Sequence, residues 1–591
     1  KGLGELPQRI KLIEESSPPP LVVLREWEKI NEKFRNYLRE RNISVYDVLA
    51  VDQIEEIAKE KGLTEQQLWA RVKLGTGSQQ ESIARPVLYY HSNYFRALLF
   101  AENCKNATKL VEEIFPAGTI THSGSFFPST GRNPAMHSGV DPFLLFSERG
   151  VTGYSSEISW GLNTPDFPGV QTLSYEGALA RALSKYFNTP MGTYLISYSY
   201  YGYPADFIKV GAYTYAAQCF SWILYFDVKY YPDTFKTVKE ANYKIGVIED
   251  RIENAEVEPA MIAIGWLTST DIWDIASDKV EPSWYAPGNT IYSGERAYLY
   301  LLLRHLQVPV DVIGEQDIVK GYLKNYDVYV LVGDHISEEA AKILSDWVKE
   351  GGILISVAGG GIRDQYNRES ELMREVFGIK EEKLIKRQNS LRPKLELLYA
   401  KPLDVIEIEK DGKKYTMEAY GYRQSFEAGQ GKIIGRYSNG EAAIVMNEYG
   451  KGKAMIIGTL PGTCYLKGAY PLKPFGRGGE DLSVYNYPDY NEKVRKFAGV
   501  LLGEMLPKPE VWTDNAIVEA NLLKDKKTGS YYVSLVNYNG KPVKNLKVMI
   551  DAGQIDVREV TSVFQKSKTE KNRDIVTVTL DINDFDFLIL K

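Results

Sequence analysis

Cysteine and histidine are scarce in this chain, with 3 and 5 residues among 591. Cys104, Cys219 and Cys464 lie far apart, and none belongs to a CxxC or Cys/His pattern. Structural zinc sites and disulfide scaffolds are recognised by such closely spaced residues. We therefore expect no metal site, no disulfide framework and no cofactor, while the compartment stays open between cytoplasmic and secreted.

The chain also lacks a positive charge excess and any long apolar run. Its 71 Lys and Arg residues are outnumbered by 77 Asp and Glu residues, which gives a net charge of −6. A nucleic-acid-binding surface needs basic residues to hold phosphates, so we expect no nucleic-acid partner. No apolar stretch approaches the roughly 20 residues that cross a bilayer, so we expect a soluble protein without a membrane span.

Tyrosine, in contrast, is abundant, with 41 residues against 21 Phe and 9 Trp. Rings with a polar tip suit surfaces that stack on ligands, although a tyrosine-rich core explains the count equally well. A chain of 591 residues is longer than a single hydrophobic core supports, so its length predicts about three or four domains.

The segment 292–364 has the clearest pattern of secondary structure. Apolar residues crowd a predicted helix at 297–306, and a short apolar strand is predicted at 327–332. The amphipathic run EEAAKILSDWVKEGG then predicts a helix that stops at its two glycines, before a second apolar strand at 353–358. Strands and helices in this order predict a parallel sheet covered on both faces.

Several phrases of this segment resemble the trimerisation domain of family 42 glycoside hydrolases, the microbial β-galactosidases. They are RHLQVPVDVI, DVYVLV, LSDWVKEGGILI and GGGIRD, in that order, and RYSNGEAAIVMNEYGKGKAMIIGTLPG at 436–462 is similar to the end of the same module. That domain is a relative of class I glutamine amidotransferases. The resemblance implies an α/β fold class: a partial TIM barrel, then a class I glutamine amidotransferase-like α/β domain, then a small C-terminal β-sandwich.

The phrase FRNYLRERNISVYDVL at 34–49 resembles the segment that follows the fourth barrel strand in that family. Residues 1–240 would then hold the C-terminal half of a (β/α)8 barrel, and residues 1–20, which end in three prolines, would be an arm or a boundary. The remaining barrel strands are expected at 117–127, 149–161, 191–202 and 221–231. A half barrel leaves both sheet edges open, so we expect a preceding segment or a second chain to complete it.

The rest of the chain divides at a proline-marked linker, 506–512. Residues 241–508 would form the amidotransferase-like trimerisation domain, with a hairpin insert at 405–421. Residues 509–591 alternate in short strands with turn signals, which predicts an antiparallel β-sandwich. The resemblance implies a homotrimer or another homo-oligomer.

Glycoside hydrolysis needs two carboxylates that flank the scissile bond. In the family that the chain resembles, the acid follows strand four and the nucleophile ends strand seven. The strand at 191–202 contains no glutamate and has Tyr198 or Ser199 at that position. This departure from the family's pattern makes a non-catalytic relative the alternative to an enzyme.

Glu157 and Asp227 are the candidate catalytic carboxylates. Glu157 stands between Tyr154 and Trp160, near the expected mouth of the barrel, where aromatic neighbours would raise its pKa toward that of a general acid. Asp227 follows the last barrel strand. A surface or loop-capping role is the alternative for each carboxylate.

Aromatic and imidazole side chains at the strand ends are the candidate saccharide ligands, since one face of a sugar ring is apolar. We predict substrate-binding roles for His122, Tyr154, Trp160, Tyr198 and Tyr200. Trp222 fits the barrel core better.

Two functions remain open. The first is a glycoside hydrolase that acts on β-galactosides or related oligosaccharides by carboxylate acid/base catalysis, with part of the barrel supplied from outside this chain. The second is a saccharide-binding or structural relative without catalysis. A glutaminase is disfavoured, because the turn Gly359-Gly360-Gly361-Ile362 offers neither Cys nor Ser as a nucleophile.

Overall fold

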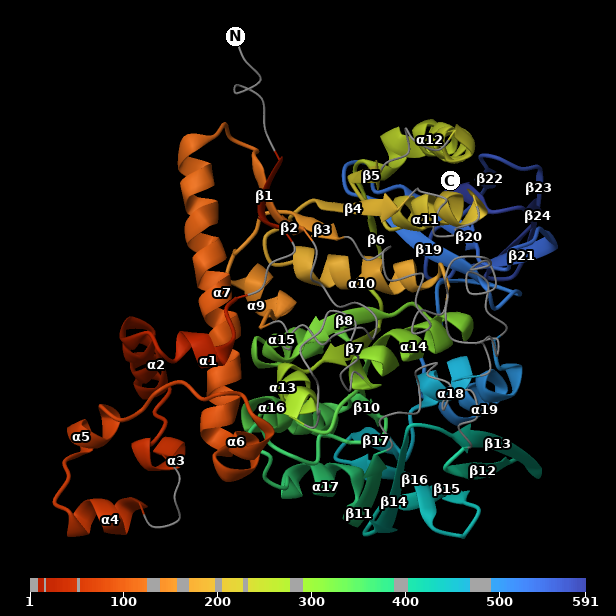
Figure 1. Ribbon diagram of the computed structural model, residues 1–591. Helices are drawn as coiled ribbons and strands as arrows, with labels where there is room; N and C mark the ends of the chain where they lie inside the picture. The colour runs from red at the N-terminus through yellow and green to blue at the C-terminus, as the bar shows by residue number, and fades with distance from the viewer. Residues whose placement is uncertain are drawn as a thin grey trace.

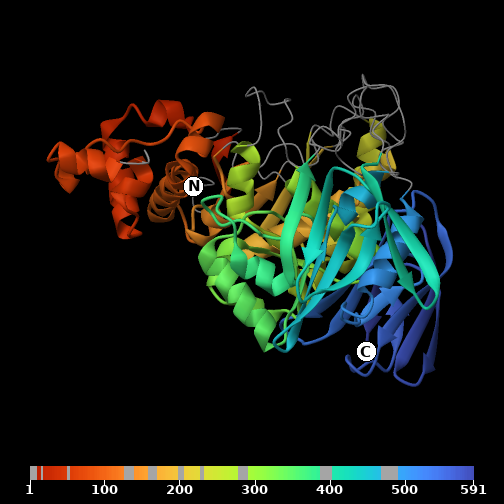
Figure 2. The same ribbon diagram turned by 90° about the horizontal axis from the view of Figure 1, so that it is seen from below.

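The computed structural model describes residues 9–14, 18–49, 54–124, 139–156, 169–196, 205–226, 232–276, 291–386, 402–467 and 490–591. Three assemblies of strands and a helical arm make up this part of the chain (Figure 1). The arm and the C-terminal strands lie at opposite ends of the molecule, as the view from below also shows (Figure 2).

The first assembly consists of five parallel strands in two ladders. β1 (Arg9–Glu14) pairs with β2 (Ile120–Gly124), and β3 (Tyr154–Ser156), β4 (Met191–Ile196) and β5 (Trp222–Phe226) pair in that order. The Thr152 N–H donates to the Thr121 carbonyl at 3.0 Å, so the two ladders lie side by side. β2 to β5 lie inside the four predicted strand regions, in the predicted order.

β1 was not predicted. The first four residues of RIKLIE alternate basic and apolar side chains, the period-two pattern of a half-buried strand, but the nearby prolines suggested an arm. β1 pairs parallel with β2 and precedes the helical segment, so residues 9–14 belong to the parallel strands. The expectation that residues 1–20 are only an arm or a boundary is therefore wrong.

Helices cover the outer side of these strands. They are α7 (Pro86–Ile114), α9 (Pro142–Ser147), α10 (Thr172–Ser184), α11 (Ala205–Ala217) and α12 (Pro232–Ile252). α10 is buried on nearly every side, because strands cover one face and the middle assembly the other (Figure 1). Residue 240, the expected domain boundary, lies inside α12.

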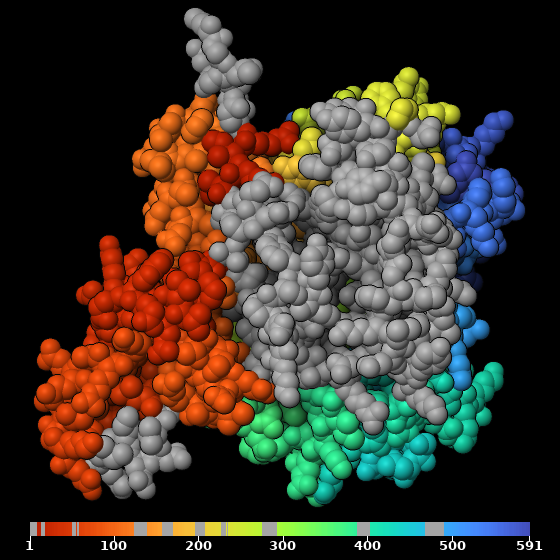
Figure 3. All heavy atoms as spheres, viewed as in Figure 1, coloured from red at the N-terminus to blue at the C-terminus, as the bar shows by residue number. Residues whose placement is uncertain are grey.

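The helical arm stands out from the rest of the molecule at the lower left of Figures 1 and 3. It contains α1 (Leu21–Leu24), α2 (Glu28–Glu40), α3 (Val45–Leu49), α4 (Ile54–Glu60), α5 (Glu65–Trp69) and α6 (Gln79–Ala84). Phe34, Leu38 and Leu68 are fully buried in a small core that the arm shares with the first half of α7.

His91 of α7 joins the arm to the middle assembly. Its Nδ1 lies 3.0 Å from the Tyr37 hydroxyl of α2, and its Nε2 lies 2.9 Å from the Tyr366 hydroxyl. Burial, with a smaller contribution from Arg41, lowers the pKa of His91 from 6.5 to about 3. His91 therefore stays neutral in the folded protein at pH values where the unfolded chain protonates it.

Acidification should loosen this junction. The folded pKa lies below the unfolded pKa, so the unfolded state binds more protons between about pH 6.5 and pH 3, and the free energy of unfolding falls as the pH drops. From pH 7 to pH 5 the loss due to His91 is about 2 kcal/mol. Thermal unfolding of wild type and of His91→Gln at pH 7 and pH 5 measures this loss. The variant should lose less stability than wild type, and equal losses would exclude His91 as the cause. Between pH 7 and pH 8, as a control, the stability of both proteins should change by the same amount.

The middle assembly is a mixed sheet whose parallel part has the order β8-β7-β9-β10-β17. These strands are β7 (Ile262–Trp266), β8 (Asp311–Gly314), β9 (Val328–Leu331), β10 (Ile353–Ser356) and β17 (Gly452–Ile457). The helices around it are α13 (Thr268–Ala276), α14 (Ile291–His305), α15 (Glu315–Val319), α16 (Glu338–Glu350), α17 (Glu371–Phe377), α18 (Pro461–Lys467) and α19 (Glu492–Leu502). The strand–helix–strand prediction for 327–358 is confirmed by β9, α16 and β10.

Antiparallel strands extend this sheet. They are β11 (Ile379–Lys386), β12 (Asp404–Lys410), β13 (Lys413–Ala419), β14 (Tyr422–Ala428), β15 (Lys432–Tyr437) and β16 (Ala442–Tyr449). β12 and β13 pair as a hairpin, with Asp411 and Gly412 in left-handed conformations at the turn. The hairpin predicted at 405–421 is confirmed.

The C-terminal assembly is an antiparallel β-sandwich, as predicted. Its strands are β18 (Val511–Thr513), β19 (Val518–Asp525), β20 (Tyr531–Asn537), β21 (Val543–Asp551), β22 (Val560–Ser562), β23 (Ser567–Asn572), β24 (Ile575–Ile582) and β25 (Phe585–Leu590). The two sheets have the orders β18-β21-β24-β23 and β22-β25-β20-β19-β6. The edge strand β6 (Ala255–Val257) comes from the chain just before the middle assembly and pairs antiparallel with β19.

Candidate active site

Side chains from β1, β2, β4 and β5 meet on the inner side of the parallel strands. The Arg9 guanidinium lies 4.4 Å from the centroid of the Trp222 ring, and the Lys11 ammonium lies 5.0 Å from that of Tyr194. His122 and Tyr194 each lie 6.1 Å from Trp222, measured between ring centroids. Cations over aromatic faces are attracted by the ring quadrupole, so these contacts hold the strands around a common interior.

Gly192 of β4 makes room for the indole. A Cβ at residue 192 would lie 1.7 Å from an atom of the Trp222 ring, so a larger residue there would push the ring away. Trp222 is partly buried and lies in this interior beside Gly192.

The contacts between β1 and β5 span this interior. β1 and β5 are the first and last of the five strands, yet Arg9 reaches Trp222. An eight-stranded barrel has an interior just wide enough for side chains from opposite strands to meet. Within the described residues, β1 pairs only with β2 and β5 pairs only with β4, so each strand has an open parallel edge.

Two of the predicted site residues are described, and they face different surroundings. His122 of β2 is buried beside Trp222 in the interior. Tyr154 of β3 is buried on the helical side, where its hydroxyl donates to Oε1 of Glu176 in α10 at 3.3 Å. The structure thus does not bring these two side chains together.

Five predicted residues lie outside the described part of the chain. They are the candidate catalytic carboxylates Glu157 and Asp227 and the candidate saccharide ligands Trp160, Tyr198 and Tyr200. Their positions follow the carboxyl ends of β3, β4 and β5 in the sequence, the end at which barrels carry their active sites. Arg9 and Lys11 were not predicted, and the alternation in RIKLIE was the signal that could have found them.

A second polar cluster lies at the carboxyl ends of β7 and β9. The chain leaves β7 for β8 on one side and then returns to β9 on the other, which makes this place a topological switch point. Arg296 donates to both carboxylate oxygens of Asp271, at 2.9 and 3.1 Å, and its guanidinium lies 4.1 Å from the centroid of the Trp266 ring. Burial raises the pKa of Asp271 to about 6, although Arg296 opposes the shift.

His335 and Lys386 share the Asp334 carboxylate in the same region. His335 Nδ1 lies 2.7 Å from Asp334 Oδ1, and Lys386 pairs with the other oxygen. Burial alone would raise the pKa of Asp334, but Lys386 and His335 outweigh it and hold the pKa far below its usual value. Trp273 stacks on the His335 ring at 5.1 Å, so the imidazole is held in place from two sides.

The turn after β10 consists mainly of glycine. Gly359, Gly360 and Gly361 all have positive φ, and the Gly359 N–H donates to Oε1 of Gln424 at 2.7 Å. No hydroxyl or thiol stands on this turn, so acyl transfer by a glutaminase mechanism has no attacking group there.

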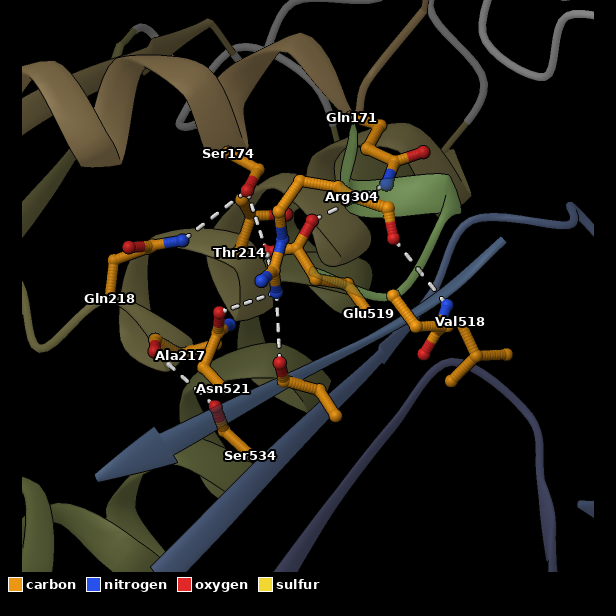
Figure 4. A network of polar contacts seen from close by, with 12 residues as sticks. Gln171, Ser174, Thr214, Ala217, Gln218, Arg304, Val518, Glu519, Asn521 and Ser534 are labelled. Carbon is orange, nitrogen blue, oxygen red and sulfur yellow. Dashed lines mark hydrogen bonds and ion pairs between the residues drawn. The ribbon is translucent and has the colours of Figure 1, made fainter. Parts of the chain in front are cut away.

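Where the three assemblies meet, a buried network is centred on Glu519 of β19 (Figure 4). Arg304 of α14 lies 3.3 Å from Glu519 and donates to the Ala520 carbonyl at 2.8 Å. From α10, the Ser174 hydroxyl donates to Glu519 at 2.6 Å. The buried charges are thus paired and hydrogen-bonded, and the network holds the assemblies together rather than forming an open site.

No group of three or more His, Cys, Asp or Glu side chains in the described residues could hold a metal ion. None of the helices in that part of the chain has the length and apolarity needed to span a bilayer.

Comparisons with known proteins agree on one architecture. Residues 276–470 match the β-galactosidase trimerisation domain family. No curated protein sequence matches the chain.

Among solved structures, the chain is similar to a catalytic mutant of Gan42B, a family 42 β-galactosidase from G. stearothermophilus, with 14% identity, a TM-score of 0.60, and coverage of 95% of this chain and 75% of that one. The β-galactosidase of Bacillus circulans sp. alkalophilus gives 16% identity, a TM-score of 0.60, and coverage of 95% and 76%. That of the haloarchaeon Halorubrum lacusprofundi gives 11% identity, a TM-score of 0.59, and coverage of 95% and 76%.

Proposed function

We propose that this chain, which has the fold of the family 42 glycoside hydrolases and carries their trimerisation domain, hydrolyses β-galactosides or related oligosaccharides. The observation that carries the proposal is the match of residues 276–470 to the β-galactosidase trimerisation domain, because that match rests on sequence and not only on shape. The same match supports a homotrimer or another homo-oligomer.

Glu157 is the proposed general acid/base and Asp227 its partner carboxylate. Both follow barrel strands, Glu157 directly after β3 and Asp227 directly after β5. A retaining enzyme holds its two carboxyl groups about 5 Å apart, and an inverting enzyme holds them about 6.5 to 9.5 Å apart, with room for a water molecule. Hydrolysis through this pair requires one of these separations.

We further propose that residues 1–240 are part of a larger ring, followed by domains at 241–508 and 509–591. The open edges of β1 and β5 support this, since unpaired backbone groups on an edge favour pairing with further strands. Apolar surface points the same way: Leu224 of β5 is 47% exposed, and an apolar cleft of about 430 Å³ lies where β1 and α7 meet α1 and α2. With β1 in the place of the fourth strand, three further strands from a preceding segment or a second chain would close an eight-stranded barrel.

A non-catalytic saccharide-binding protein is the second candidate. The observation that favours it is the sequence of β4 and the residues after it, MGTYLISYSYYG, which contains no carboxylate where the family places its nucleophile.

One experiment separates the two candidates. The protein is incubated with p-nitrophenyl β-galactoside and with β-1,4-linked galactobiose, and both hydrolysis and binding are measured. Hydrolysis by the wild-type protein that is lost in the Glu157→Gln variant supports the enzymatic function. Binding of galactobiose without turnover supports the second candidate, and the absence of both would contradict the saccharide assignment altogether.

A further inference from the structure

A lysine-rich cleft lies where the barrel helices meet the β-sandwich. Its volume is about 460 Å³, within the range of small-molecule sites. α11 contributes Lys209 and Tyr213, and the turn between β24 and β25 contributes Asp584. The remaining lining residues come from α12 and are Lys236, Lys239, Glu240, Tyr243 and Lys244.

Two of the four lysines form ion pairs within the protein. Lys209 and Lys244 lie 2.9 and 2.6 Å from the two carboxylate oxygens of Asp584. Burial alone would raise the pKa of Asp584, but the two ammonium groups outweigh it and lower the pKa. This triad links α11 and α12 to the sandwich, so it accounts for those two lysines structurally.

The other two lysines have no such role. Lys236 and Lys239 are exposed and form no ion pair with any residue that the structure describes, although Glu240 follows directly on the same helix. Together with Glu240, they give the open side of the cleft a net positive charge. An anionic group entering there would meet two ammonium donors, and charge-assisted hydrogen bonds of this kind are about twice as strong as neutral ones.

Tyr213 and Tyr243 add two further features of a ligand site. Tyr213 is fully buried and lines the cleft, yet its hydroxyl has no hydrogen-bond partner within the described part of the chain. A buried hydroxyl without a partner is costly unless a ligand or water satisfies it. Tyr243 is 76% exposed, so its ring offers a flat apolar face beside the lysines.

We propose that this cleft binds an anionic saccharide unit, with Lys236 and Lys239 on its carboxylate or sulfate group and Tyr243 against the apolar face of its ring. The identification of the ligand as a saccharide rests on the proposed function, while its negative charge rests on the lysines. The site is separate from the barrel interior, because its lining comes from the outer helices and the sandwich.

Titration calorimetry tests the proposal at low salt, about 20 mM, where surface charges are weakly screened. The probes are galacturonate, galactose 6-sulfate, neutral galactose and inorganic phosphate. We expect each anionic sugar to bind at least about tenfold more tightly than galactose and than phosphate. The relative affinities of galacturonate and galactose 6-sulfate show which anionic group the cleft prefers.

The double variant Lys236→Met/Lys239→Met should weaken binding of the anionic sugars about tenfold and leave galactose unchanged. Lys342→Met, which removes an exposed lysine from α16, is the matched control and should change nothing. Tyr213→Phe should weaken binding with no loss of thermal stability, since its hydroxyl has no partner to lose.

Three results would overturn the proposal: galactose binding as tightly as the anionic sugars, phosphate binding as tightly as they do, or the double variant binding them like wild type. These measurements need no turnover. Anion binding by a protein that hydrolyses nothing would contradict only the proposed enzymatic function, and hydrolysis without anion binding would contradict only the cleft.

Discussion

Replacing Glu157 by glutamine should lower kcat for a β-galactoside by about 10²- to 10⁴-fold, the usual contribution of a general acid/base. Glutamine keeps the shape of the side chain but cannot donate a proton to the leaving oxygen. KM should change far less, because the amide still fills the same space and binds the ground state similarly. Steady-state kinetics with β-1,4-linked galactobiose, whose sugar leaving group needs that proton, measure both constants.

The matched control is Glu113→Gln, which neutralises an exposed carboxylate of α7 and should leave the kinetics unchanged. Asp227→Asn should reduce kcat by a comparable factor if Asp227 is the partner carboxylate. A Glu157→Gln protein with wild-type kcat would exclude Glu157 as the acid, and the enzymatic proposal would then need another carboxylate.

Arg304→Met should destabilise the protein strongly, with a loss of about 3 to 5 kcal/mol. Arg304 is buried and lies 3.3 Å from Glu519, so its removal leaves a buried carboxylate without its counter-charge. It also removes the donors to the Ala520 carbonyl and to the Asn521 side chain, at 2.8 and 2.9 Å. Denaturant unfolding followed by tryptophan fluorescence measures the loss.

The double variant Arg304→Met/Glu519→Met separates the destabilisation due to an unpaired buried carboxylate from the contribution of the ion pair itself to stability. It should be more stable than Arg304→Met alone, because apolar residues can replace a buried ion pair at little net cost. Arg495→Met, which removes a partly exposed ion pair with Glu492, should cost less than about 1 kcal/mol. If Arg304→Met lost no more unfolding free energy than Arg495→Met, then Arg304 would not be needed to stabilise the buried Glu519 carboxylate.

The sequence predicted the elements whose periodicity was strong. Residues 327–358 form β9, α16 and β10 because a continuous apolar strand, an amphipathic helix ending at Gly351 and a second apolar strand each favour one structure locally. The sandwich strands were predicted for the same reason. β1 was missed because the prolines at 18–20 suggested an arm, and the contacts of Arg9 and Lys11 with aromatic rings on strands far away in the sequence leave no local signal.

The site was harder to predict, since its contacts join residues far apart in the sequence. Tyr154 was expected to bind substrate. Successive side chains of a strand point to opposite faces, however, and Tyr154 points toward the helices, where its hydroxyl donates to Glu176 of α10. The Asp584 triad and the Arg304–Glu519 pair each unite residues more than two hundred positions apart. No local pattern signals such pairs.

Amide hydrogen exchange at β1 and β5, in the protein isolated from its natural source, tests the central claim most directly. If these strands belong to a closed ring, the alternate amides that face away from β2 and β4 pair with further strands and exchange as slowly as those of β4, which lies between two neighbours. Protection of both outer edges is the predicted result. Rapid exchange at those edges, with β4 protected, would contradict the account, because β1 and β5 would then end the sheet.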